Sequence, residues 1–423
     1  MIRISQIACP LDADGKYVQM AARALHVRPE EIDDVRVCKK SVDARDKRNV
    51  HFSLTLDVRM KRPIAHLPKN AEALPDPAPA APVAQAKPMR NRPIVVGMGP
   101  AGLFAALHLA QAGLKPLVIE RGKSVEERAH DVEAFWSGGV FSPASNVQFG
   151  EGGAGTFSDG KLNSGIKDVR CRRVLETFAR MGAPEEILYQ AKPHIGTDRL
   201  RLVVKNIRRE IIRLGGEVRF ETKLEGLYIT NGRLTGAKLG GQDVECDHLI
   251  LAIGHSARDT FEMLDSMQIM MEQKPFSLGA RIEHKQIMIN RSQYGAAAAH
   301  PALGAADYKL SAHLPDGRAA YTFCMCPGGQ VVAAASESGG VAVNGMSLFA
   351  RDGENANSAL LISVGPGDYG ADDPLAGVRF QRKWERAAFI AGGSNYHAPA
   401  QLVGDFLRGA PSKAAGSVRP TYR

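Results

Sequence analysis

Apolar and polar positions at the start of the chain follow two different periods. Short segments with apolar residues at alternate positions predict strands at residues 2–8, 34–38 and 51–59. Residues 16–25 have the helical period instead, with their apolar positions on one face. The charged stretch 39–48 is expected to be a solvated hairpin loop, with a docking or RNA-contact loop as the minority alternative. Residues 1–63 are therefore predicted to form a small α+β module.

A change of composition marks the end of this module. Residues 74–88 consist largely of Pro and Ala and contain almost no bulky apolar side chain. Such a segment is extended and semi-rigid and has too little apolar surface to pack. We therefore place a Pro/Ala-rich linker at residues 64–92.

A buried strand, a glycine turn and the start of a helix follow one another directly after the linker, at residues 92–102. In the G-x-G-x-x-G pattern, Gly97 permits the tight turn and Gly99 lets the backbone approach a pyrophosphate. Gly102 lets the helix pack close to the strand. The free N–H groups and the positive dipole end of the helix would face the phosphates.

The segment that follows completes the context that this pattern requires. An Ala- and Leu-rich helix is expected at residues 103–112, and a second apolar strand at 116–119 ends at Glu120. That carboxylate lies about 20 residues beyond the last glycine, where the pattern needs an acceptor for a ribose hydroxyl. The alternative is an ordinary βαβ unit in which the glycines occur by chance. The sequence predicts a dinucleotide site.

The remainder alternates between helical and strand patterns. A basic amphipathic helix is expected at residues 198–214, and strands are expected at 217–221, 224–230, 234–239, 243–246 and 248–255, the last of them buried. The turn signals between the three middle strands suggest a small meander. Further strands at 276–283, 321–336 and 358–364 suggest a second, mixed sheet, with helices at 373–388 and 398–407.

Length and composition limit the classes of protein that fit. A chain of 423 residues is too long for one simple core, so two or three domains are expected. It has no apolar run near the roughly 20 residues that span a bilayer and no signal-peptide core at its start, which favours the cytoplasm. Its six cysteines are too scattered for a disulfide framework and lack zinc spacing, so we expect no metal. The net charge of +9 suits phosphate-bearing ligands.

Four motifs carry a resemblance to a known family. They are the glycine-dense residues 150–162 and the segments 275–284, 323–329 and 344–347. With them the chain resembles the bacterial NAD(P)/FAD-dependent oxidoreductases, an uncharacterised group of FAD-dependent dehydrogenases with a glutathione-reductase-like FAD-binding fold. The turn Ala252, Ile253 and Gly254 resembles the "ATG" motif of that fold. The resemblance covers essentially the whole chain and implies FAD, a cytoplasmic location and a flavin redox reaction.

The resemblance also assigns residues to the cofactor. It places Gly97, Gly99, Pro100, Ala101 and Gly102 at the pyrophosphate, Glu120 and Arg121 at the adenosine ribose, and Gly152, Gly153, Gly155 and Thr156 along the ribityl chain or the flavin edge. It adds Asp159, Gly160, Lys161, Ala252, Ile253, Gly254 and His255 to the cofactor-binding set. Consecutive glycines can expose amide donors to phosphate and flavin oxygens, which agrees with these assignments. The alternative for the second glycine segment is a flexible surface turn.

Three residues are candidates for catalysis. A cation at Lys161 could stabilise an anionic reduced flavin, and a solvent-facing lysine is the equal alternative. Cys324 and Cys326 could offer a redox-active thiol to the flavin. We favour a structural role for both, as two small buried residues that the period of a strand places on one face.

The expected fold class is α/β, with a Rossmann-like FAD/NAD(P)-binding domain that carries a β-meander, a second α+β substrate domain and the N-terminal module. The FAD domain is expected at 93–164 and 195–262, the substrate or cap domain at 165–194 and 263–385, and a return helix with a polar tail at 386–423. The resemblance further implies that relatives continue beyond residue 423 with a segment that completes the FAD domain. Its loss would weaken or abolish FAD binding.

The predicted function is an FAD-dependent oxidoreductase that transfers hydride between the flavin and an unidentified organic substrate or NAD(P)H. No second, independent dinucleotide-binding unit is expected, because the glycine string within 361–368 aligns with the second domain. NAD(P)H is therefore expected only as a transient reductant. We expect a small-molecule substrate and no membrane association. The alternative is an inactive flavoprotein-like scaffold whose basic N-terminal module binds RNA or a protein partner.

Overall fold

The computed structural model describes residues 1–75, 83–370 and 373–422, so part of the expected linker, residues 76–82, lies outside the described residues. The chain divides into two compact units. Unit 1 is built from residues 1–82, 161–195 and 285–308, and unit 2 from residues 83–160, 196–284 and 309–423. The segments expected to form one substrate domain are thus divided between the two units.

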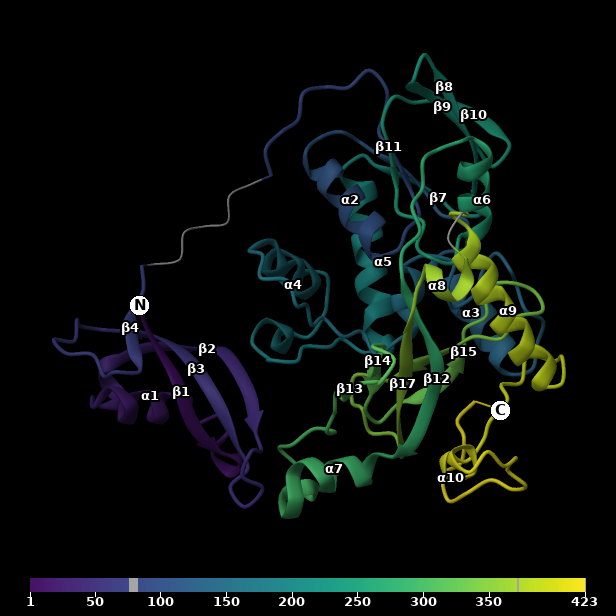
Figure 1. Ribbon diagram of the computed structural model, residues 1–423. Coiled ribbons are helices and arrows are strands. Elements are labelled where there is room, and N and C mark those ends of the chain that lie inside the picture. Colours follow the sequence, from purple (N-terminus) through teal and green to yellow (C-terminus); the bar gives the residue numbers. More distant parts are fainter. Residues whose placement is uncertain (76–82, 371–372, 423) are drawn as a thin grey trace. The chain divides into compact units, whose positions relative to one another are not determined.

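Unit 1 contains a four-stranded antiparallel sheet in the order β2-β3-β1-β4. Its strands are β1 (Ile2–Pro10), β2 (Ile32–Asp43), β3 (His51–Met60) and β4 (Ala71–Ala73) (Figure 1). Helix α1 (Tyr17–Leu25) buries Ala21, Ala22 and Leu25 against the apolar residues of these strands. The predicted α+β module is therefore present.

The charged stretch 39–48 is not wholly a loop, which corrects the sequence-based expectation. Strand β2 continues to Asp43, and Lys39 and Lys40 pair with Thr55 and Leu54 of β3. Charged side chains are common on such an edge strand because they discourage pairing with other chains. Residues 189–191 nevertheless join this edge, since the amide of Lys40 donates to the carbonyl of Tyr189 at 2.8 Å.

Two other segments complete unit 1. They contribute α4 (Arg170–Arg180) and α7 (Gln286–Tyr294), and the unit also has the short 3-10 helices η1 (Leu11–Ala13), η2 (Pro29–Glu31), η4 (Glu185–Leu188) and η5 (Gly295–Ala299). Lys192 and Asp307, one from each segment, form an ion pair at 2.6 Å.

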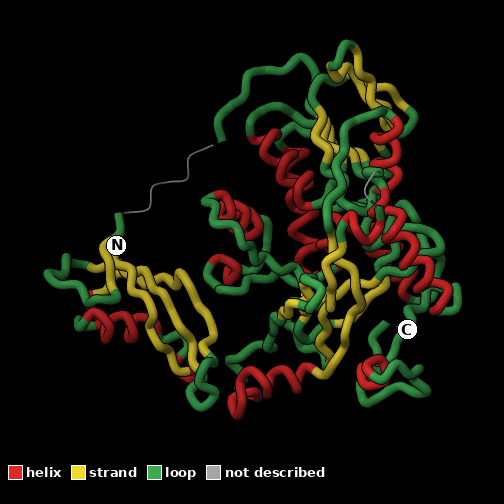
Figure 2. The backbone as a smooth tube through the Cα atoms, viewed as in Figure 1, coloured by secondary structure: helices red, strands yellow, loops and turns green. Residues whose placement is uncertain are grey.

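Unit 2 is built around a parallel sheet in the order β11-β5-β6-β7. The strands are β5 (Ile94–Val96), β6 (Leu117–Ile119), β7 (Glu217–Arg219) and β11 (Leu249–Leu251). Helices α2 (Pro100–Gln111) and α5 (Thr197–Arg213) pack against each other and against this sheet (Figure 2). Helix α3 (Val125–Trp136) packs against α5, and α6 (Arg258–Ser266) packs against a neighbouring strand, β8 (Leu224–Thr230). This is the predicted Rossmann-like arrangement.

Strand β11 departs from the prediction of a buried strand. Ile250 and Leu251 are 38% and 42% exposed, because β11 is the edge strand of the sheet and β5 is its neighbour. The meander is formed as predicted by β8 (Leu224–Thr230), β9 (Arg233–Leu239) and β10 (Gln242–Glu245). Its apolar residues share a core with those of β5 and β6.

The rest of unit 2 contains the second sheet, in the order β12-β17-β14-β13, and a separate β15-β16 pair. The strands are β12 (Phe276–Lys285), β13 (Ser311–His313), β14 (Ala319–Cys326), β15 (Gln330–Ala333), β16 (Val343–Met346) and β17 (Asn355–Val364). The helices are α8 (Pro366–Tyr369), α9 (Ala376–Ala391) and α10 (Val403–Leu407). The apolar run 321–336 is thus two strands separated by a turn, and only the second half of the expected helix 398–407 is helical.

Candidate functional site

A cavity of about 550 Å³ lies in unit 2, where the strands β5, β6 and β11 end. Val96, Ile119 and Leu251, the last residues of these strands, all line it. Ligands of open α/β sheets bind outside the carboxyl ends of the strands. The cavity also has the size typical of small-molecule sites.

The first glycine loop joins β5 to α2, and two of its glycines are required by the fold itself. A Cβ atom on Gly97, which has a φ of +96°, would lie 2.5 Å from the carbonyl oxygen of Ala252. A Cβ atom on Gly102 would lie 1.9 Å from the carbonyl oxygen of Gly97. These two glycines allow strand β5, helix α2 and the turn after β11 to approach one another.

Gly99 is different, because the packing of the protein does not require a glycine there. Its φ of −71° suits any residue, and a Cβ atom would meet only the Cα of Gly153, at 3.9 Å. Gly155 also lines the cavity, and a Cβ atom there would meet nothing within 4 Å. Glycines that the fold does not need, at the wall of a cavity, are expected where a ligand approaches the backbone closely. Gly99 also precedes the N-terminus of α2, whose first N–H groups suit an anion.

The second glycine loop lies directly against the first. The amide of Gly152 donates to the carbonyl of Met98 at 2.8 Å, and Gly153 faces Gly99. The loop then enters the 3-10 helix η3 (Gly153–Phe157). The structure thus brings together the two segments that the sequence assigned to one cofactor.

Glu120 holds these loops in place through its carboxylate, which is buried at 5% exposure. It accepts hydrogen bonds from the amides of Met98 at 2.8 Å, Gly122 at 2.9 Å and Gly150 at 3.0 Å. An ionised carboxylate has about four acceptor positions. One position remains for a ribose hydroxyl, which is the predicted role of Glu120.

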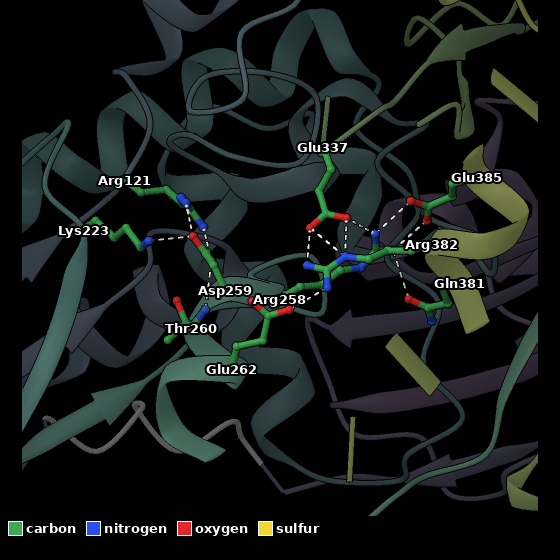
Figure 3. A network of polar contacts seen from close by, with 10 residues as sticks. All are labelled: Arg121, Lys223, Arg258, Asp259, Thr260, Glu262, Glu337, Gln381, Arg382 and Glu385. Carbon is green, nitrogen blue, oxygen red and sulfur yellow. Dashed lines mark hydrogen bonds and ion pairs between the residues drawn. The ribbon is translucent and has the colours of Figure 1, made fainter. Parts of the chain in front are cut away.

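Arg121 is held at the wall of the cavity by a charge cluster (Figure 3). Its guanidinium donates to both oxygens of Asp259, at 2.9 and 2.8 Å, and lies 4.3 Å from the ring centre of Phe149. Lys223 also lines the cavity and pairs with Asp259 at 2.6 Å. Burial raises the pKa of Asp259, but the hydrogen bonds from the two cations outweigh it and hold this pKa well below its ordinary value. Asp259 is therefore ionised at neutral pH.

The turn after β11 supplies another wall of the cavity. Ala252, Ile253, Gly254 and His255 all line it. Burial lowers the pKa of His255, and the nearby charge of Arg258 lowers it further. The imidazole is therefore neutral at pH 7, with Nε2 3.3 Å from the hydroxyl of Ser256.

Six of the predicted cofactor-binding residues do not line the cavity: Gly102, Gly152, Thr156, Asp159, Gly160 and Lys161. The carboxylate of Asp159 is fully buried and is bound by Arg351 and by the hydroxyl of Ser347. Thr156 is also fully buried. Lys161 belongs to unit 1, where it pairs with His194 in a β-bridge. Their predicted roles stay predictions.

The two candidate cysteines lie in β14 and do not line the cavity. The expectation that both lie on one face of a regular strand is wrong, because the pairing of β14 with β17 is irregular between Phe323 and Cys326 and Cys324 has a φ of +46°. The thiol of Cys326 is buried and donates to the carbonyl of Cys324 at 3.3 Å.

Sequence reasoning missed several residues of the cavity wall. They include Gln148, Thr222, Lys223, Ser256, Thr260 and Phe261. They lie in loops and on α6, where no spacing rule marks them. Among residues 1–75, 83–370 and 373–422 there is no group of three or more His, Cys, Asp or Glu that could hold a metal ion. The described helices also include none that is long and apolar enough to cross a membrane.

Comparisons with known proteins agree with a nucleotide site of this kind. Residues 91–286 match the family model of the pyridine nucleotide-disulphide oxidoreductases, and residues 275–423 match the C-terminal domain-like model of FAD-dependent proteins. An uncharacterised protein of Clostridium beijerinckii is 47% identical over all of this chain and 80% of its own length. The chain belongs to the FAD-dependent oxidoreductases. The cofactor of this FAD-dependent oxidoreductase is accordingly FAD. Two features of the cavity fit this cofactor: the absence of a side chain at Gly99 and the buried carboxylate of Glu120.

Other matches of the FAD-dependent oxidoreductase are more distant. A thiamine thiazole synthase of Aeropyrum pernix is 25% identical over 38% of this chain and 47% of its own length. The crystal structure of a glycine oxidase from Bacillus cereus is 14% identical over 47% of this chain and 63% of that chain, with a TM-score of 0.25. Residues 1–59 match a domain of unknown function.

Proposed function

We propose that the chain binds FAD in the cavity of unit 2 and transfers hydride between FAD and an organic substrate, or between FAD and NAD(P)H. The observation that carries this proposal is the pair of glycines, Gly99 and Gly155, that line the cavity without being needed by the fold. FAD supplies the two-electron chemistry when it is bound, and the protein supplies binding, orientation and charge.

The residues of the cavity divide this work between them. The N-terminus of α2 would hold the diphosphate through the first helical N–H groups after Pro100, which has none itself. Because Gly153 faces Gly99, we place the backbone around Gly153 and Gly155 at the diphosphate as well, rather than at the ribityl chain that the resemblance implies. Glu120 would accept from a ribose hydroxyl with its remaining lone pair. Arg121 would contact the adenosine end, in the orientation fixed by Asp259.

The reactant that exchanges hydride with FAD is either NAD(P)H or an organic substrate. Of the three G-x-G-x-x-G patterns in the sequence, the one at 97–102 joins a strand of the parallel sheet to a helix, whereas those at 150–155 and 365–370 do not. This supports NAD(P)H as a transient reductant rather than a permanently bound partner. The neutral imidazole of His255, at the cavity wall, can donate a hydrogen bond to a substrate or accept one from it. The inactive RNA-binding scaffold that was the alternative has no support in the comparisons, and the cytoplasmic location stays a prediction.

The test is a measurement of flavin binding on the whole chain. We expect the purified protein to take up FAD, with a flavin absorption spectrum that is bleached anaerobically by NADH or NADPH, or by an organic substrate found by screening. Gly99→Val should lose FAD but stay folded, because its Cβ has room within the protein.

Gly226→Val is the matched control, since a Cβ atom at Gly226 would also meet a single atom at 3.9 Å, the Cβ of Lys238 in the meander. This variant should retain FAD. Wild-type protein that cannot be reconstituted with FAD, or a folded Gly99→Val variant with unchanged flavin content, would refute the proposal.

A further inference from the structure

An arginine that the sequence patterns do not mark lies beneath the second glycine loop. Arg128, on the second turn of α3, is fully buried. A guanidinium has five N–H donors. In Arg128 they reach five main-chain carbonyls, those of residues 146, 147, 150, 151 and 153, at distances from 2.6 to 3.2 Å. All five belong to one loop.

The position of the Arg128 side chain also requires a glycine in this loop, at Gly150. Gly150 has a φ of +117°, and a Cβ atom there would lie 2.4 Å from the Cδ atom of Arg128. The loop passes over the stem of the arginine, and no larger residue fits at position 150. The opposite side of the loop faces the cavity through Gln148, Phe149, Gly150 and Gly153.

We propose that Arg128 is the positioning residue that gives the second glycine loop its diphosphate-binding conformation, an inference that rests on the proposed binding of FAD in this cavity. The five carbonyl oxygens, which would repel a phosphate, are turned toward the guanidinium. At the cavity wall, Gly150 and Gly153 have no side chain, and their carbonyl oxygens are bound to Arg128. Arg128 itself does not line the cavity, so it acts through the loop.

The charge of Arg128 is kept despite its burial. Burial lowers the pKa of the guanidinium to about 10, and the carboxylate of Glu120 acts in the opposite direction. Arg128 is therefore protonated at pH 7. A fixed positive charge beneath a diphosphate-binding loop favours the anion over any neutral ligand.

A second arginine provides a matched control. The guanidinium of Arg201 lies 4.9 Å from the ring centre of Phe157, as does that of Arg128. Arg201 pairs with Glu133 at 3.1 Å, and its side chain is 30% exposed. Arg201→Met therefore removes a guanidinium from the same aromatic ring without touching the carbonyls of the loop.

The experiment compares Arg128→Lys, Arg128→Met and Arg201→Met in the full chain. Dissociation constants for FAD and for ADP, which both carry a diphosphate, are measured by titration on the folded fraction. We expect both constants to rise at least tenfold in Arg128→Met and by a smaller factor in Arg128→Lys, because lysine keeps the charge but has only three donors. Arg201→Met should bind both ligands within about twofold of the wild type.

Hydrogen–deuterium exchange of the protein without ligand gives a second measurement. Exchange should accelerate at residues 146–155 in the Arg128 variants while β5 and α2 stay protected. Unchanged affinity in folded Arg128 variants, or acceleration spread evenly over unit 2, would overturn the inference and leave Arg128 as a general core residue. Wild-type protein that takes up no FAD would instead refute the proposed function, and the exchange measurement would still show whether Arg128 holds the loop.

Discussion

The charge network at the start of α6 leads to a quantitative prediction for Arg258. Its side chain is 3% exposed and donates to both carboxylate oxygens of Glu385, at 2.8 and 2.6 Å, and to Glu337 at 2.7 Å (Figure 3). Glu385 lies on α9, so this arginine joins α9 to the helix that follows the cavity turn. We predict that Arg258→Met destabilises the protein substantially.

The magnitude follows from what the substitution leaves behind. Removal of one partner of a buried ion pair costs about 3–5 kcal/mol, because the remaining charge stays desolvated. Glu337 keeps a second partner, Arg382, at 2.6 Å. Glu385 is the partner that loses its bidentate contact, and its side chain is 22% exposed. We therefore expect a loss near the lower end of that range, about 3 kcal/mol.

Urea denaturation of the full chain, followed by circular dichroism, measures this loss. The double variant Arg258→Met/Glu385→Gln should lose less than the sum of the two single losses, since no charge is then left without its partner. Arg408→Met removes an exposed ion pair with Asp405 and should cost less than about 1 kcal/mol. A loss below about 1 kcal/mol in Arg258→Met, or strictly additive losses, would refute the reasoning.

Three further predictions concern the loops and the cysteines. Gly97→Ala should cost about 2–5 kcal/mol of unfolding free energy, because it adds left-handed strain to the contact with Ala252, and an undiminished urea midpoint would contradict this. Burial raises the pKa of Glu151 from 4.5 to about 7, so the folded state holds this proton more tightly than the unfolded chain. Stability should therefore fall by about 3 kcal/mol as pH rises from about 4.5 to 7, and titrated urea unfolding of Glu151→Gln should lack this component. Cys326→Ala should reduce the rate of flavin reduction by less than about twofold, since its thiol is buried away from the cavity wall, and a larger loss would show a redox role.

The sequence predicted the elements that depend on local patterns. The strand, turn and helix around Gly97, the amphipathic helix α5 and the three meander strands were found within a few residues of their observed bounds. The errors lie where tertiary pairing decides the outcome. Strand β2 extends into a charged stretch because β3 pairs with it, and β11 is half-exposed because it lies at the edge of its sheet.

The candidate site shows the same division. The residues of the first glycine loop could be named from their spacing, and those of the second loop and of the turn after β11 from the family resemblance; many of them line one cavity. Lys223, Asp259 and Arg128 could not, because each acts through contacts with residues distant in sequence. Asp159 was assigned to the cofactor by the family resemblance, and the structure shows its carboxylate bound by Arg351.

The glycine pattern combines two physical requirements that the sequence alone cannot separate. At Gly97, Gly102 and Gly150, a Cβ atom would collide with the protein itself, so the packing of the fold requires glycine at these positions. At Gly99 and Gly155 it would not, and the proposed approach of FAD to the backbone accounts for glycine at these two positions. A chain could therefore keep its fold while losing its cofactor through a change at Gly99 alone. For this reason, the presence of a glycine at position 99, rather than the pattern as a whole, is the stronger argument that the cavity still binds a dinucleotide.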